Sequence, residues 1–305
     1  MGTTTAKRTS ADIDDTAKDG TPEITGEALK QRYEQVLENV ANAAKRSGRR
    51  AQDIITVAVT KYASPDQIKA VYNLGHSDFG ENRAQQLIQR AAMMEEHVKR
   101  RDILVQTRRE LSSLFKDDPE QEHAGHPVRW HMIGHLQRNK VKKTLEVVRL
   151  LHSADSLRLA EEVQQYAMKH DTTVEVLLQV NSTGEESKEG CPLPAAKYLA
   201  EQIDTMVYVR VRGLMTMGPT PVEGESHQEF LSKTRECFER TRDLFEDIGK
   251  LDISEGQFNL LSMGMSNDYE IGIECGANLI RVGSAIFGDH QEADATNDDA
   301  DSGED

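Results

Sequence analysis

The sequence predicts a single (β/α)8 barrel of the TIM type, preceded by an N-terminal helix and flanked by disordered tails. Between Gly26 and Gly288, eight short segments of β-branched and apolar residues alternate with segments of helical apolar spacing. Strands separated by crossover helices lie parallel, and eight of them in about 250 residues suit a closed barrel. A doubly wound open sheet is the competing α/β architecture. No Gly-x-Gly-x-x-Gly follows the first strand and no P-loop motif is present, which favours the barrel.

The charge of the chain is acidic and unevenly placed. The formal net charge is −15, and residues 289–305 hold eight acids and no Lys or Arg. This acidic tail and residues 1–25 are poor in apolar side chains, so we expect both to be disordered. The basic residues form no stripe, which argues against nucleic acid as a partner. No apolar window reaches membrane-spanning length, and the N-terminus has no signal-peptide core. Because Cys191, Cys237 and Cys275 are odd in number and unclustered, no disulfide framework is indicated. We expect a reduced, cytoplasmic protein, and we also expect a monomer.

The first predicted strand, 54–61, is apolar on both faces, as in a buried parallel strand. An amphipathic helix over Gly26–Gly48 precedes it, with the final glycine as C-cap. Ser64 as N-cap and Pro65 at the first helical position begin the next helix. Lys61 therefore lies at a strand's C-terminal end, where a desolvated amine can attack a carbonyl carbon. The alternative is a lysine whose aliphatic stem merely covers the strand end.

The remaining strands follow with helices between them. They are predicted at 77–82, 128–134, 150–154, 174–181, 207–217, 258–263 and 279–282. A helical insertion is predicted at about 93–127, with a polar turn at Asp117-Asp118-Pro119. Two histidines follow that turn, His123 and His126, but no Cys or carboxylate accompanies them at ligand spacing. We interpret them as solvated loop residues and predict no metal site.

In a barrel, the C-terminal ends of all strands converge on one mouth. The candidate residues there are Lys61, Asn82, His135, Asp155, Asn181, Met215 to Met217, Ser262 to Ser266, Arg281, Gly283 and Ser284. Ser266 and Gly283–Ser284 follow the last two strands, where barrels commonly bind phosphate. Ser266 is also predicted to cap a short helix beginning near Asn267. Asp155 is interpreted as a helix cap and the methionines as pocket wall, and an ordinary turn residue is the alternative for Asn82.

A lysine opposite a phosphate site suggests pyridoxal 5′-phosphate (PLP), an aldehyde that carries a phosphate. The chain resembles the YggS/PROSC family of PLP homeostasis proteins from about Glu27 to Gly288. The matching motifs are Val59-Thr-Lys61-Tyr, Phe79-Gly-Glu-Asn82, Trp130-His-Met-Ile-Gly134, Leu136-Gln137, Asn139-Lys140, Gly213-Leu-Met215, Leu261-Ser-Met-Gly-Met-Ser266, Arg281-Val-Gly-Ser284 and Ile286-Phe-Gly288.

The resemblance implies a barrel like the N-terminal domain of alanine racemase, with PLP as cofactor. The implied cofactor site consists of Lys61 as the Schiff-base lysine, Asn82 as a pocket residue, Arg281 facing the pyridine nitrogen, and Ser266, Gly283 and Ser284 around the phosphate. Two features depart from the family. His135 stands where the family often has proline, and the 93–127 insertion is longer than the family's usual link.

Three functions remain open on the sequence. The resemblance implies a protein that binds, stores or delivers PLP, with apo-enzymes that use PLP as partners and no efficient catalysis. An amino-acid racemase is the alternative, but it needs a second acid–base group on the opposite face of the substrate. The chain ends 17 residues after Gly288, so we expect no second domain to supply that group. A Schiff-base aldolase would need an acid–base partner beside Lys61, for which Asp155 is the candidate.

Overall fold

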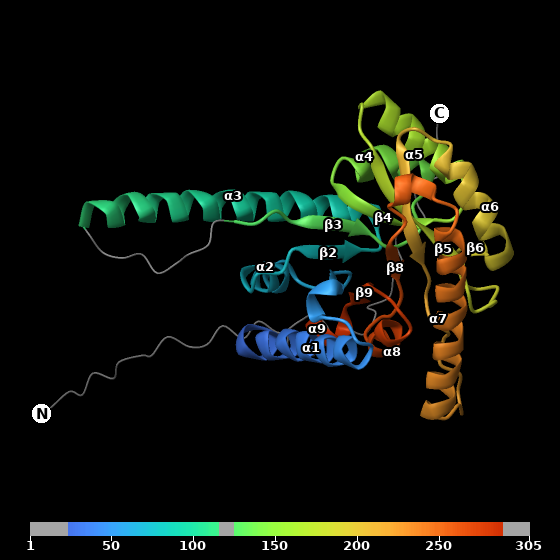
Figure 1. Ribbon diagram of the computed structural model, residues 1–305. Helices are drawn as coiled ribbons and strands as arrows, with labels where there is room; N and C mark the ends of the chain where they lie inside the picture. Colours follow the sequence, from blue (N-terminus) through green and yellow to red (C-terminus); the bar gives the residue numbers. More distant parts are fainter. Residues whose placement is uncertain (1–23, 116–124, 289–305) are drawn as a thin grey trace, which may run out of the picture.

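The computed structural model describes residues 24–115 and 125–288, and these residues form a closed parallel barrel (Figure 1). Its eight strands are β1 (Ile55–Val59), β2 (Asp78–Glu81), β3 (Arg129–Met132), β4 (Val148–Ala154), β5 (Val174–Asn181), β7 (Val209–Met215), β8 (Leu260–Ser262) and β9 (Leu279–Val282). Neighbouring strands pair in the order β4-β3-β2-β1-β9-β8-β7-β5, and a further β4–β5 pairing closes the ring. The predicted (β/α)8 fold is confirmed.

The order of the strands explains why the predicted site residues lie close together. β1 is bonded to β2 on one side and to β9 on the other. The strand that leads to Lys61 thus lies between the strand before Asn82 and the strand that contains Arg281. In the register, Val57 lies opposite Arg281, and Ala58 lies opposite both Phe79 and Val282.

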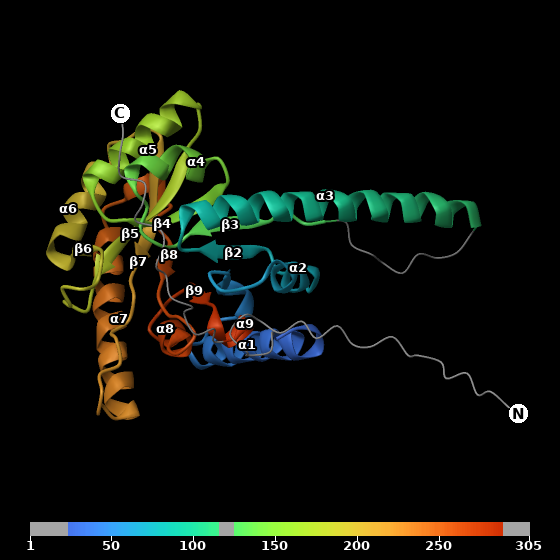
Figure 2. The same ribbon diagram turned by 180° about the vertical axis from the view of Figure 1, so that it is seen from behind.

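Helices cover the outside of the barrel, as both views show (Figures 1 and 2). They are α1 (Gly26–Arg46), α2 (Pro65–Asn73), α3 (Ala84–Phe115), α4 (Val141–Leu145), α5 (Leu157–Lys169), α6 (Leu193–Asp204), α7 (His227–Gly249), α8 (Tyr269–Glu274) and α9 (Ser284–Phe287), with 3-10 turns η1 (Ala51–Asp53), η2 (Arg138–Lys140) and η3 (Ile253–Gly256). A two-residue strand, β6 (Cys191–Pro192), pairs with the end of β5 in addition to the eight predicted strands. The main apolar core lies between the strands and the helices. A separate, smaller apolar cluster is formed by residues from five strands, among them Val57 and Leu177.

Two of the predicted helix ends, the C-terminal end of α1 and the N-terminal end of α2, agree with the structure. Gly48 follows the last turn of α1 with a φ of 71°, a left-handed conformation that glycine adopts without steric cost. Ser64 caps α2 by accepting from the amide of Gln67, and Pro65 occupies the first turn. These two signals place β1 and the turn that follows it, which carries Lys61.

The predicted insertion begins inside a helix. α3 runs without a break from Ala84 to Phe115, and Figure 2 shows its far half extending beyond the barrel. Its near half packs in the core through Leu87 and Met94, which are fully buried. The predicted polar turn at 117–119 and His123 lie outside the described residues, as do most of residues 1–25 and the acidic tail. Within the described ranges, no helix is both long and apolar enough to cross a bilayer.

Candidate functional site

A cavity of about 490 Å³ opens at the C-terminal end of the barrel strands. All six predicted cofactor residues line it: Lys61, Asn82, Ser266, Arg281, Gly283 and Ser284. They come from four loops or strand ends that are distant in sequence but adjacent around the ring. The size lies within the usual range for small-molecule sites. The structure therefore brings together the residues that the sequence singled out.

One side of this cavity is built from the loops after β8 and β9. The backbone amides of Gly283 and Ala285 both donate to Ser266 Oγ, at 3.1 and 3.3 Å. The two amide N–H groups thus converge on one point, and converging backbone N–H groups of this kind can bind an anion. A Cβ on Gly283 would lie 3.3 Å from the Val59 side chain, so glycine lets this loop approach the end of β1 closely.

The predicted capping role of Ser266 is wrong. The short helix α8 begins at Tyr269, its N-cap is Asp268, and no side chain caps it. Asp268 instead accepts from the amide of Met265, at 2.6 Å, and so holds the β8 loop in a turn. Burial raises the pKa of Asp268, against the Met265 hydrogen bond and the charge of Arg281. Ser266 is left facing the β9 loop and the cavity.

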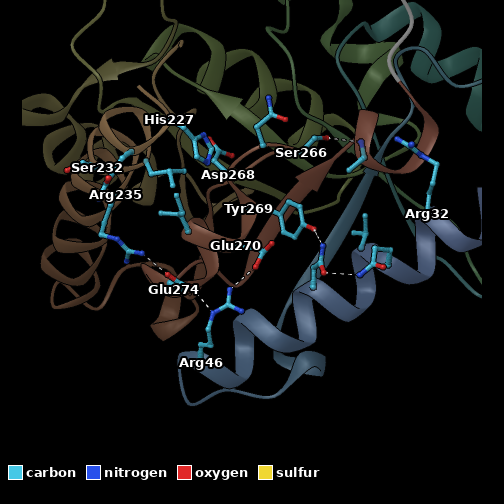
Figure 3. Close-up of a pocket in the computed structure, with 18 of the residues that line it drawn as sticks. Arg32, Arg46, His227, Ser232, Arg235, Ser266, Asp268, Tyr269, Glu270 and Glu274 are labelled. Carbon is cyan, nitrogen blue, oxygen red and sulfur yellow. Dashed lines mark hydrogen bonds and ion pairs between the residues drawn. The ribbon is translucent and has the colours of Figure 1, made fainter. Parts of the chain in front are cut away.

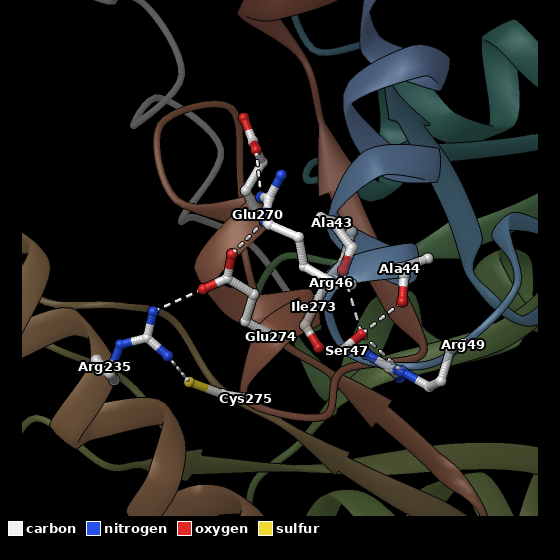
Figure 4. A network of polar contacts seen from close by, with 10 residues as sticks. All are labelled: Ala43, Ala44, Arg46, Ser47, Arg49, Arg235, Glu270, Ile273, Glu274 and Cys275. Carbon is white, nitrogen blue, oxygen red and sulfur yellow. Dashed lines mark hydrogen bonds and ion pairs between the residues drawn. The ribbon is translucent and has the colours of Figure 1, made fainter.

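Contacts from outside the barrel hold this side of the cavity in place. Arg32 of α1 donates to the carbonyl oxygens of Ser284, at 2.6 Å, and Ile286, at 3.2 Å. A second hollow of about 1010 Å³ lies here between α1, α7 and α8, and it shares Ser266 to Asp268 with the mouth cavity (Figure 3). At its edge, Arg46 bonds Glu270 and Glu274, and Glu274 also pairs with Arg235 (Figure 4).

The opposite side of the cavity carries Lys61, and here the structure differs from the expectation. A desolvated amine was predicted, but the Lys61 side chain is exposed. Its Nζ lies 4.4 Å from the centroid of the Tyr62 ring, which is itself 39% exposed. The amine thus rests against an aromatic face, with access to solvent.

A buried ion pair lies beneath the Lys61 turn. Glu81 is completely buried and pairs with Arg90 of α3, and it accepts from the Thr60 hydroxyl at 3.1 Å and from the Asn82 amide at 2.8 Å. Arg90 also donates to the carbonyl oxygens of Ala63, at 3.1 Å, and of the lysine itself, at 3.5 Å. One guanidinium therefore joins the turn after β1 to the carboxylate at the end of β2.

Arg281 forms part of the floor of the cavity and is 3% exposed. It donates to Ser262 Oγ and, at 2.8 Å, to the carbonyl oxygen of Thr216. Burial lowers the pKa of Arg281 to about 10, partly opposed by the charge of Asp268. The guanidinium remains charged at neutral pH and can only donate hydrogen bonds.

Other predicted mouth residues do not all reach the cavity. Asn181 binds its own loop, donating to the carbonyl oxygens of Glu185 and Lys188, and it does not line the cavity. Asp155 is not a helix cap, because Ser156 is the N-cap of α5 and makes no side-chain cap. The carboxylate of Asp155 lies 3.7 Å from His135 Nδ1, at the rim.

The methionines divide in the same way. Met217 and Met265 line the cavity as predicted, whereas Met215 and Met263 are buried in the cores. His126, away from the mouth, stacks on Tyr72 and bonds the carbonyl oxygen of His76 at 2.9 Å. In the described ranges no cluster of three or more potential metal ligands is found.

The sequence reasoning missed several lining residues: Tyr62, Gln179, Glu189 and Asp268. Gln179 lies near the end of β5 with its side chain in the cavity wall. Residues two apart in a strand share a face, so a prediction that Asn181 faces the mouth should have included Gln179 as well. Glu189 comes from the loop before β6 and lies 3.6 Å from His135 Nδ1. No local signal in the sequence marks that contact.

Comparison with known proteins now gives the family. Residues 32–291 match the family described as alanine racemase, N-terminal domain. The chain is 32% identical over 265 residues to the pyridoxal phosphate homeostasis protein of Aquifex aeolicus (strain VF5), covering 86% of this chain and 98% of that one. The chain belongs to this family of pyridoxal phosphate homeostasis proteins. The family's solved structures can therefore be compared with the barrel.

Two solved structures support the same fold. An unknown protein from Bifidobacterium adolescentis is 31% identical with a TM-score of 0.72, covering 87% of this chain and 98% of its own. PipY of Synechococcus elongatus PCC7942, solved with PLP bound, is 27% identical with a TM-score of 0.61, covering 83% and 100%. Alanine racemase of Clostridium difficile 630 is only 12% identical, so its similarity shows the barrel fold alone.

Proposed function

We propose that this protein binds pyridoxal 5′-phosphate and takes part in its homeostasis within the cell, by binding, storing or delivering it, without efficient catalysis. The supporting observation is that an amine and an anion-binding set of groups line one cavity. Family membership supports the same proposal, since the relatives are named for PLP homeostasis and PipY was solved with PLP bound. Apo-enzymes that require PLP are the proposed recipients.

The residues present fit the chemistry of PLP. The aldehyde supplies the carbon that a lysine amine attacks, and Lys61 is the lysine that lines the cavity. The Ser266 hydroxyl and the amides of Gly283 and Ala285 suit the phosphate, with the Ser284 side chain beside them. Amides that converge on one hydroxyl oxygen can converge equally on a phosphate oxygen.

Arg281 is proposed to face the ring nitrogen from the cavity floor. Because the guanidinium stays charged, it donates a hydrogen bond to the nitrogen and does not protonate it. This weakens the ring as an electron sink, which disfavours carbanion chemistry. Asn82 is proposed as a wall of the same pocket. The backbone of Asn82 lies close to Gly134, because a Cβ on Gly134 would lie only 2.2 Å from the Asn82 carbonyl oxygen.

The exposure of Lys61 supports a carrier over an enzyme. A PLP enzyme keeps water away from its reacting atoms, whereas here water and incoming amines can reach the lysine. Such access suits the release of the cofactor to water or to another amine. The aldolase alternative loses support, because Asp155 does not line the cavity with Lys61.

The experiment that tests the proposal begins with a visible spectrum of purified protein incubated with PLP. We expect a yellow protein that bleaches with hydroxylamine, and after borohydride reduction a modified peptide that contains Lys61. Incubation of the loaded protein with an apo-enzyme should then restore that enzyme's activity. A protein that takes up no PLP at all would overturn the proposal.

A separate measurement tests the absence of efficient catalysis. L-alanine is incubated with the loaded protein in deuterium oxide, and loss of the α-proton signal is followed by NMR. We expect no exchange above the rate with free PLP. Exchange at enzyme-like rates that disappears in Lys61→Ala would support a racemase instead.

A further inference from the structure

A continuous chain of buried polar side chains runs from Arg281 through the barrel interior. Arg281 Nη1 bonds Ser262 Oγ on β8, and this oxygen lies 3.3 Å from His152 Nδ1 on β4. His152 Nε2 lies 3.0 Å from His131 Nδ1 on β3. His131 Nε2 lies 3.1 Å from Asp78 Oδ1 on β2. Five strands contribute one residue each to this chain, and Ser262 and both histidines in its middle are at most 4% exposed.

When both imidazoles are neutral, the two ends of this chain fix the direction of every hydrogen bond in it. A guanidinium has only donors, and a carboxylate has only acceptors. If both imidazoles are neutral, His131 donates through Nε2–H to Asp78, and its Nδ1 accepts from His152 Nε2–H. The Nδ1 of His152 then accepts from the Ser262 hydroxyl, whose oxygen accepts from Arg281. Every buried donor and acceptor along the chain is satisfied in this one arrangement.

The electrostatics of His152 and Asp78 agree with this arrangement. Burial, to which the positive charge of Arg281 adds, holds the pKa of His152 well below its ordinary value. Burial alone would raise the pKa of Asp78, but hydrogen bonds from Arg129 and His131, and the charge of Arg129, hold it below its usual range. His152 is therefore neutral and Asp78 is a carboxylate.

The competing arrangement has His131 doubly protonated. His131 would then donate to His152 Nε2, and His152 would donate through Nδ1–H to Ser262. The Ser262 oxygen would receive two donors, and its own hydrogen would find no acceptor among the described residues. An unsatisfied buried hydroxyl costs about 1–3 kcal/mol. The neutral arrangement is favoured on this ground.

We propose that this chain orients Arg281 toward the cofactor ring, with Ser262, His152 and His131 as positioning residues and Asp78 as its electrostatic anchor. The proposal deepens the proposed function, on which its cofactor-related part rests. Arg281 is buried, and within residues 24–115 and 125–288 it makes no hydrogen bond to a carboxylate. Hydrogen bonds in a low-dielectric interior polarise one another, so the distant carboxylate favours the charged guanidinium through the chain.

The protonation pattern can be tested without the cofactor. Long-range ¹H–¹⁵N spectra of the protein distinguish the two nitrogens of each imidazole. We expect both His131 and His152 to be neutral, with the proton on Nε2. Ser262→Ala should alter the His152 resonances, whereas Ser153→Ala should not. Ser153 is the buried neighbour of His152 on β4, and its hydroxyl has no hydrogen-bond partner among the described residues, which makes it a matched control.

The coupling to the cavity is tested from the far end of the chain. Asp78→Asn keeps the shape but removes the charge, and Asp78 does not line the cavity. We expect PLP to bind about fivefold more weakly or worse, the lower end of the range for coupled sites, with a shifted absorption maximum. Arg129→Met is the control, because it removes the other partner of the Asp78 ion pair and leaves the carboxylate in the chain.

The outcomes separate this proposal from the proposed function. A wild-type protein that takes up no PLP overturns the function, and the NMR experiment still decides the chain. An Nδ1–H or doubly protonated His131 or His152 in the wild-type protein overturns the chain. So does Asp78→Asn that binds PLP with unchanged affinity and spectrum. A merely structural role would lower stability in Asp78→Asn and Arg129→Met alike and leave both spectra unchanged.

Discussion

The two sides of the mouth cavity are built in opposite ways. The side made by the β8 and β9 loops consists of backbone amides and short hydroxyl side chains, and Arg32 holds it from outside. The side made by the β1 turn presents one long, exposed lysine above a buried ion pair. On the first side, the groups that would bind the ligand are themselves held in place. On the second side, only the backbone turn that carries Lys61 is held, by the buried pair of Glu81 and Arg90. This difference suits a protein that retains a phosphate group firmly and exposes its covalent link to exchange.

The largest effect is expected from Lys61→Ala. The variant should fold, because the removed side chain is exposed, but borohydride should no longer fix PLP to the protein. If the phosphate side is preorganised, the variant should still bind PLP without a covalent link. Mass spectrometry of the reduced protein and equilibrium dialysis with PLP measure the two properties.

The control for this variant is Lys188→Ala, which removes a lysine from the loop before β6. Lys188 donates to the carbonyl oxygen of Gly218 and does not line the cavity. The reduced adduct should be unchanged in this control. A reduced adduct that persists in Lys61→Ala and maps to another lysine would place the covalent link elsewhere.

The next largest effect is expected on stability, from Arg90→Met. This change leaves the Glu81 carboxylate completely buried without its cation, which costs about 3–5 kcal/mol of unfolding free energy. The turn that carries Lys61 also loses its link to α3, so the rate of covalent attachment should fall. Urea unfolding and the rate of colour formation on adding PLP measure these two effects.

A matched ion-pair change on the other side of the cavity is Arg46→Met. Arg46 is half exposed and joins α1 to α8 on the protein surface, where ion pairs contribute little (Figure 4). We expect a much smaller loss of stability and an unchanged rate of attachment. Equal losses in the two variants would contradict the view that the lysine turn depends on a buried pair.

The sequence predicted the barrel and six of the residues that line the cavity. The barrel follows from local patterns, and the six residues follow from the strand ends together with the resemblance to the family. Alternation of strands with helices sets the parallel ring, and the ring brings strand ends together whatever the distance in sequence. Ser64 and Pro65 fixed the start of α2 for the same local reason. These inferences needed no knowledge of side-chain packing.

The parts that sequence could not predict depend on contacts between distant residues. The exposure of Lys61 depends on the loops around it, not on its strand. The partner of Ser266 is a backbone amide 17 residues away instead of its own helix. Ser262 and His152 are 110 residues apart in the sequence, and no local motif around either residue predicts that they are in contact.

A smaller effect is expected from Ser284→Asp, which tests the preorganised side. A carboxylate beside the bound phosphate dianion should weaken PLP affinity by about 1–3 kcal/mol or more. Ser284→Ala, which adds no charge, should weaken it less. Lys61 is untouched in both variants, so slow covalent attachment should persist at high PLP concentration. Unchanged affinity in Ser284→Asp would place the phosphate outside these loops.

The smallest effect is expected from shortening α3. This change tests how much of the helix is needed to hold the turn that carries Lys61. Arg90 and the fully buried Met94 belong to its near half, whereas Ile103 and Leu104 in its far half are 64% and 59% exposed. Val105 beside them is buried but belongs to neither core cluster. Asp102 accepts from the amide of Gly125 at 2.7 Å, so a short glycine–serine link can replace residues 103–124.

We expect the shortened protein to bind PLP with unchanged affinity and to lose little stability. Met94→Ala in the near half of the same helix is the contrasting variant, since a buried methionine costs about 2–5 kcal/mol when truncated. Urea unfolding and PLP titration of both variants provide the comparison. If the shortened protein bound PLP more weakly or failed to fold, the far half of α3 would be needed by the barrel. The position of Lys61 would then depend on more of α3 than the buried pair of Glu81 and Arg90.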